Sequence, residues 1–130
     1  MIDFVDPGNP THDVIIKWAY DQTVEEPISQ DWDLIIADID NGYLFLKLSS
    51  DNTCPKKDFF LNCLYLLVGD TVRTNGLAHD KTEVKKIVNV GRFKGDQRIR
   101  KWVNESDFLF ENPKTFDYEI WCDGGWNKLS

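Results

Sequence analysis

Arg73 and His79 are the two side chains whose types could do chemistry together, and the five residues TNGLA separate them. An arginine can hold a phosphate group while a histidine acts as a general acid or base, as RNA cleavage requires. Gly76, however, predicts a turn between them, which favours an arginine at a helix end and a histidine in an exposed loop. The net charge of −7 also argues against a nuclease, since a surface that binds RNA should be basic.

Other patterns typical of enzymes are missing from the sequence. Asp31 with Asp33 and Asp38 with Asp40 are each two residues apart, a spacing at which side chains do not face each other on a helix. The glycines in VGDTVRTNG and GRFKGD lack the GK[ST] or GxGxxG context that phosphate binding requires. No GxSxG or HExxH pattern is present. We therefore predict that the protein is not an enzyme and needs no cofactor.

The cysteines favour a structural role in a reducing compartment. Cys54, Cys63 and Cys122 are an odd number without CxxC spacing, and the two histidines lie far from them in the sequence. A zinc site would need four ligands at recognisable spacings. The first ten residues lack a signal-peptide pattern, and the longest apolar run, residues 59–68, is about half the length that crosses a bilayer. We predict a cytoplasmic protein without a metal site or membrane contact.

Negative charge is concentrated in the N-terminal part of the chain. Residues 1–80 contain 14 acids and 5 bases, whereas residues 81–130 contain 8 acids and 10 bases. No Lys or Arg occurs between Trp18 and Leu46, where there are seven acids: Asp21, Glu25, Glu26, Asp31, Asp33, Asp38 and Asp40. Such a surface repels nucleic acid and membrane headgroups and attracts basic proteins. We predict that these acids bind a protein partner, with Tyr118 and Trp126 as aromatic anchors.

The spacing of apolar residues predicts an all-α fold in a single domain over residues 1–130. Helices are expected after Thr11, after Ser29, over 43–49, from Pro55 to Thr74, over 82–91, over 96–112 and after Pro113. Residues 56–74 are apolar almost all round, which predicts a central helix. Six or seven short antiparallel helices would surround it, and their pairs could stack as in armadillo-like proteins. The bases from Arg92 to Lys101 are expected on a solvated helix face.

Residues 33–48 have two interpretations. Asn41-Gly42 between two apolar runs is typical of a type I′ hairpin turn. The apolar residues before it, Trp32, Ile35, Ile36 and Ile39, instead have the spacing of one helical face. A hairpin would need a third strand, which the sequence does not provide. We therefore predict a helix that Asn41-Gly42 caps at its C-terminus, followed by a short helix over 43–49.

Two stretches resemble a family of small bacterial helical proteins that is similar to the immunity proteins of contact-dependent inhibition and other polymorphic toxin systems. They are CPKKDFFLNCLYLLVGDTVRT, residues 54–74, and residues 98–126 with FDYEIWCDGGW; WDL at 32–34 is a weaker match. Ten of the matching residues are expected to be structural: Pro55, Phe60, Cys63, Tyr65, Gly69, Asp70, Arg73, Phe116, Trp121 and Gly124. The resemblance implies a cytoplasmic inhibitor of a toxin domain, commonly a nuclease.

An immunity protein that occludes a basic nuclease toxin is thus the leading hypothesis. The main alternative rests on Arg73 and His79, which are similar to the R-x(4-6)-H pattern of HEPN-type ribonucleases. The third hypothesis is a helical adaptor for another cytosolic protein. An acidic protein suits a partner that must be basic to hold nucleic acid.

Overall fold

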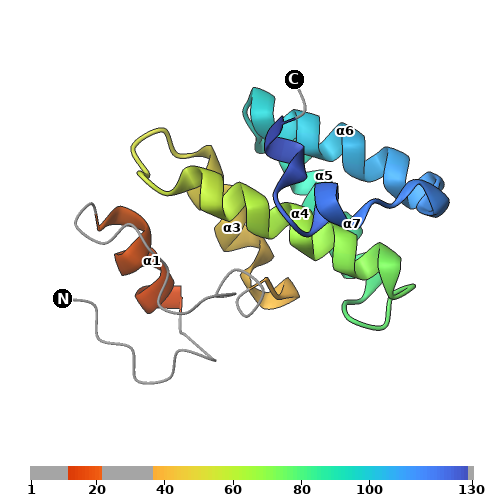
Figure 1. Ribbon diagram of the computed structural model, residues 1–130. Coiled ribbons are helices and arrows are strands. Elements are labelled where there is room, and N and C mark those ends of the chain that lie inside the picture. Colours follow the sequence, from red (N-terminus) through yellow and green to blue (C-terminus); the bar gives the residue numbers. More distant parts are fainter. Residues whose placement is uncertain (1–11, 22–36, 129–130) are drawn as a thin grey trace.

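The computed structural model describes residues 12–21 and 37–128, and these residues contain helices and no strand (Figure 1). The elements are α1 (His12–Tyr20), η1 (Ile39–Asn41), α3 (Gly42–Ser50), α4 (Lys57–Arg73), α5 (Lys81–Lys94), α6 (Gln97–Glu111), η2 (Pro113–Thr115), α7 (Tyr118–Trp121) and η3 (Gly125–Lys128). The predicted all-α fold is therefore confirmed. No helix in the described part of the chain is both long and apolar enough to span a membrane.

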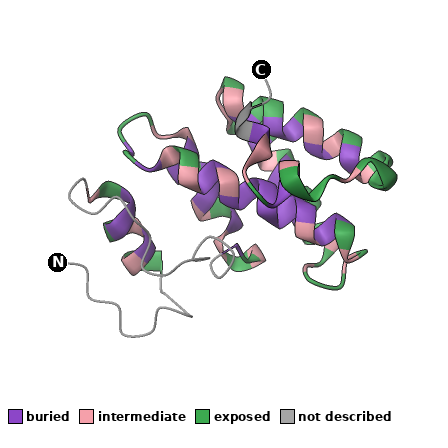
Figure 2. Ribbon diagram, in the orientation of Figure 1, coloured by how far each residue is buried: buried purple, intermediate pink, exposed green. Residues whose placement is uncertain are grey.

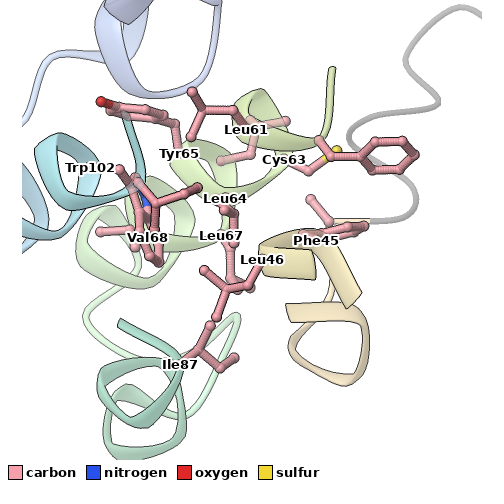
Figure 3. Close-up of a cluster of buried hydrophobic side chains, with 14 of the residues drawn as sticks. Phe45, Leu46, Leu61, Cys63, Leu64, Tyr65, Leu67, Val68, Ile87 and Trp102 are labelled. Carbon is pink, nitrogen blue, oxygen red and sulfur yellow. The ribbon is translucent and has the colours of Figure 1, made fainter. Parts of the chain in front are cut away.

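Helix α4 lies at the centre, as its sequence predicts. It packs against α3, α5, α6 and α7, and most of its length is buried (Figure 2). Its buried side chains lie on every face: Phe60, Leu61, Cys63, Leu64, Tyr65, Leu66, Leu67, Val68, Thr71 and Val72. One apolar cluster joins them to residues of the surrounding helices, among them Phe45, Ile87 and Trp102 (Figure 3).

Polar side chains fix where the next two helices begin. The carboxylate of Asp80 accepts a hydrogen bond from the backbone N–H of Glu83 at 3.0 Å, and Asp96 accepts one from Ile99 at 3.0 Å. These N-caps satisfy backbone donors that have no partner within the helix. Helix α6 ends at Glu111, two residues before Pro113, as predicted.

Asn41-Gly42 does not form a hairpin turn, and the predicted cap that ends a long helix here is wrong, because the short η1 continues directly into α3 at Gly42. Gly42 has φ −58° and ψ −46° and is the first residue of α3. A Cβ at this position would lie 2.4 Å from Cδ1 of Ile87 on α5, so the glycine permits a close helix contact. The helix expected after Ser29 falls mostly on residues 22–36, outside the described part; Ala37 and Asp38 are not helical. The short helix over 43–49 is confirmed as α3.

Candidate functional site

The predicted acidic surface is described only at its two ends. Asp21 is half-buried after α1, and Asp38 and Asp40 are exposed beside η1. The Asp38 carboxylate caps η1 by accepting a hydrogen bond from the Asp40 N–H at 3.4 Å. The other four acids, Glu25, Glu26, Asp31 and Asp33, lie outside the described residues. The structure therefore shows how the acidic stretch begins and ends.

The start of the acidic stretch is held by a buried lysine. Lys56 precedes α4, and its Nζ donates hydrogen bonds to the backbone oxygens of Trp18, at 2.6 Å, and Asp21. The ammonium also lies 4.6 Å from the centre of the Trp18 ring. A cation at the C-terminus of a helix satisfies its last carbonyls and complements its dipole. Lys56 thereby attaches the end of α1, and with it Asp21, to the α3–α4 loop.

Two further contacts join α1 to the same loop. The Tyr20 hydroxyl donates a hydrogen bond to the Asp51 carboxylate at 2.5 Å, and the Cys54 thiol lies 3.5 Å from the carbonyl oxygen of Ala19. The bond to Asp51 raises the pKa of Tyr20 to about 12, because removing the phenol proton would place two negative charges side by side. The same bond is the main reason that the pKa of Asp51 is lowered.

The net charge differs sharply between the residues before and after position 36, which lies within the acidic stretch. Residues 37–128 contain 14 acids and 14 bases, whereas residues 1–36 contain 8 acids and one base. The whole net charge of −7 is therefore carried by the first 36 residues. A long-range attraction for a cationic partner would originate there.

The two predicted aromatic anchors have different surroundings. Tyr118 is 55% exposed, at the start of α7. Trp126 is 6% exposed; its ring stacks on Tyr65 with centroids 4.7 Å apart, and its Nε1 donates a hydrogen bond to Oδ1 of Asn62 at 2.8 Å. Trp126 thus lies in the core and fastens the C-terminal segment to α4, which does not suit the predicted role of an exposed anchor.

Helix α7 lies unusually close to α4. A Cβ on Gly69 would be 2.8 Å from Cβ of Trp121 and 3.3 Å from Sγ of Cys122. After α7 the chain turns at Gly124, whose φ of +75° favours glycine. Of the ten residues expected to be structural, Phe60, Cys63, Tyr65, Gly69 and Trp121 are buried.

Arg73 and His79 are not joined by a helix. Helix α4 ends at Arg73, and the chain then turns through Asn75 and Gly76, which have φ of 53° and 84°. The Nε of Arg73 lies 2.8 Å from the Asp70 carboxylate, and this bond raises the pKa of the guanidinium. The arginine of the predicted pair therefore already has an anionic partner.

All three cysteines are buried, and none of them forms a disulfide bond. Desolvation raises the pKa of Cys54, and desolvation together with the charge of Asp70 raises that of Cys122 to about 12. Both are consequently thiols at neutral pH, which disfavours a nucleophilic role. In the part of the chain that the structure describes, no three His, Cys, Asp or Glu side chains are grouped so as to hold a metal ion.

A groove between α3 and α5 was not expected from the sequence. It encloses about 300 Å³ and is lined by Tyr43, Leu46, Lys47, Ser50, Val90, Gly91, Lys94 and Gly95. Tyr43 with Lys47 and Val90 with Lys94 are each four residues apart, which places each pair on one face of its helix. That repeated spacing was the available signal, but only the contact between α3 and α5 brings the two pairs together.

Comparisons with known proteins return no match: no family model, no curated protein and no solved structure matches the chain.

Proposed function

We propose that the protein is an immunity protein, a non-enzymatic inhibitor that binds a basic toxin domain and occludes its active site. The observation that carries the proposal is the division of charge: residues 1–36 hold the entire net charge of −7, and residues 37–128 are balanced. The resemblance of residues 54–74 and 98–126 to an immunity-like family supplies the class of partner. A nuclease toxin fits best, because it must be cationic to hold nucleic acid.

The acidic stretch is well placed to speed the association with a basic partner through electrostatic steering. Asp38 and Asp40 are exposed and are followed by the helical body, while Asp21 is fixed through its backbone by Lys56. Carboxylates concentrated in one region of the chain raise the association rate with a cationic partner, and salt weakens this electrostatic steering. Tyr118 is an exposed aromatic that can contribute to the contact. The armadillo-like stacking and the cytoplasmic location belong to this proposal as well.

The test uses the product of the gene immediately upstream as the candidate toxin. We would measure association rates at low and high salt for the wild-type protein and for a triple variant, Asp31→Asn, Asp33→Asn and Asp38→Asn. Asparagine also caps helices well, so the third change leaves η1 intact. Tight, salt-sensitive binding is expected, with an association rate about tenfold lower in the variant at low salt.

A matched control distinguishes an effect of the acidic stretch from an effect of the total net charge. Glu111→Gln, Glu119→Gln and Asp123→Asn change the net charge by the same amount at exposed positions of the C-terminal part. We expect the control to associate nearly as fast as the wild-type protein. Equal slowing in both variants would remove the acidic stretch from the mechanism, and no binding at all would overturn the immunity function.

The ribonuclease alternative has less support, because Arg73 is bonded to Asp70 and the chain turns before His79. The pure protein would have to cleave RNA, and the His79→Ala variant would have to lose that cleavage, for this alternative to be supported.

A further inference from the structure

The floor of the groove between α3 and α5 is apolar, and the two helices pack closely beneath it. Leu46 of α3 lies at the floor, and Gly91 of α5 lies against it: a Cβ on Gly91 would be 3.3 Å from Cδ2 of Leu46 and 3.1 Å from Cγ2 of Ile99. The absence of a side chain on Gly91 lets α5 pack closely on Leu46 and Ile99, and Gly91 lines the groove beside Leu46. The cavity of about 300 Å³ is at the small end of ligand sites.

The rim of the groove is cationic. Lys47 stands on the α3 side and Lys94 on the α5 side, and both are exposed. Neither forms an ion pair with another described residue, and no acid lines the groove. Asp51 is four residues after Lys47, but its carboxylate already accepts hydrogen bonds from Tyr20 and Thr53. Two cations that have no carboxylate partner among the described residues therefore flank an apolar cavity.

Exposed aromatic side chains lie on both helices that form the groove. Tyr43, which lines the groove, is 51% exposed. Phe93, one helical turn beyond Val90, is 74% exposed. Phe93 precedes the lining residue Lys94, and a large exposed apolar side chain next to a pocket can contact a ligand that extends beyond it. A ligand that uses all of these groups must be longer than the cavity.

We propose that this groove binds an acidic peptide segment of a partner protein. One large apolar side chain of the segment enters the cavity above Gly91, while carboxylates on either side of it meet Lys47 and Lys94. Backbone and side chains beyond the cavity contact Tyr43 and Phe93. This surface prefers a partner of opposite charge to the one proposed for the acidic stretch, so the protein carries two recognition surfaces with different specificities.

The extent of the surface favours a peptide over a small anionic molecule. A small carboxylate could fill the cavity and reach one or both lysines, but it would leave the exposed Phe93, three residues after Val90 on α5, without a contact. An extended or helical segment can place an apolar anchor in a pocket and charged residues at its rim, the arrangement common to peptide-binding grooves. Charge at the rim then selects acidic over basic sequences.

The experiment selects peptides from a random displayed library on the intact protein. A double variant, Lys47→Glu with Lys94→Glu, is used for counter-selection, and peptides that bind the wild-type protein alone are sequenced. We expect sequences rich in Asp and Glu around one large apolar residue. The leading peptide, fluorescently labelled, should bind the wild-type protein at least about tenfold more tightly than the double variant.

Three comparisons make the result decisive. Lys81→Glu with Lys114→Glu changes the net charge equally away from the groove and should leave affinity nearly unchanged, and thermal melting checks that both variants fold. Backbone NMR shifts on binding should gather on α3 and α5. Selected peptides without acids, equal binding to both double variants, or a small carboxylate such as octanoate that binds while no peptide does would each overturn the proposal.

Discussion

Helices α1 and α7 are both attached to the central part of the molecule, but by different means. Helix α7 has only four residues, and its contact with α4 depends on close apolar packing: Gly69 lets Trp121 approach, and Trp126 stacks on Tyr65. Such contacts depend little on pH or salt. Shape complementarity therefore fixes the C-terminal segment.

Helix α1 combines one large ring with polar contacts. Trp18 is buried against Phe59 and Phe60, with ring centroids 4.8 and 5.8 Å apart. Around it, Lys56 and the Tyr20–Asp51 bond hold the end of the helix. Since the acidic stretch follows α1 directly, the part of the chain proposed to bind the toxin is attached by contacts that respond to pH.

The largest expected effect comes from breaking the α7 side. Trp126→Ala removes a buried ring that stacks on Tyr65, and the loss of packing should reduce the free energy of unfolding by about 3 kcal/mol. Trp126→Phe keeps an aromatic ring but loses the bond to Asn62, so it should reduce the free energy of unfolding by only about 1 kcal/mol. Urea unfolding measures both. Equal small losses would show that the C-terminal segment is only loosely attached.

Removing the buried cation should weaken the α1 side by a smaller amount. Lys56→Met keeps most of the apolar stem but removes the hydrogen bonds to Trp18 and Asp21, and we expect a loss of about 2 kcal/mol. Hydrogen exchange should become faster in α1 than in α6. Lys57→Met, at the next position, serves as the control. Equal changes in α1 and α6 would mean that the whole fold is destabilised, against the idea of a local attachment.

A third variant tests how tightly α7 fits. Gly69→Ala gains helix propensity of about 1 kcal/mol, but its Cβ would lie 2.8 Å from Cβ of Trp121, which must move. Because this atom lies next to the backbone, the shift involves α7 itself, and we expect a net loss of about 1 kcal/mol. Thermal unfolding gives the sign. A stabilised variant would show that α7 moves aside easily.

The central helix and its neighbours were predictable because local signals agree there. Residues 57–73 are apolar on almost every face. Asp80 and Asp96 are strong N-caps, and Pro113 lies just after α6. Each of these signals acts within a few residues along the chain. They identify helices without any knowledge of the tertiary contacts.

The sequence was least informative where a residue makes a contact with a distant part of the chain. Gly42 looked like a turn residue, but it is glycine because Ile87 of α5 lies against it. Trp126 looked like a surface anchor, but Tyr65 and Asn62, more than sixty positions earlier, bury it. The groove depends on the pairing of α3 with α5 in the same way. Sequence spacing identifies a helical face, whereas only the fold determines what covers it.

The smallest predicted effect concerns pH at the α1 side. The bond to Asp51 raises the pKa of Tyr20 to about 12, so its stabilising effect is present below pH 10 and is lost as pH rises through 12. The lowered pKa of Asp51 makes the same effect disappear as pH falls through the acidic range. The difference in unfolding free energy between wild type and Tyr20→Phe should thus be level near neutral pH and shrink at both extremes. Tyr43→Phe, which removes a hydroxyl at another exposed position, is the control in the same urea titrations. A difference that stays constant across pH would show that Tyr20 attaches α1 through its ring alone and that the acidic stretch does not depend on an ionisable contact.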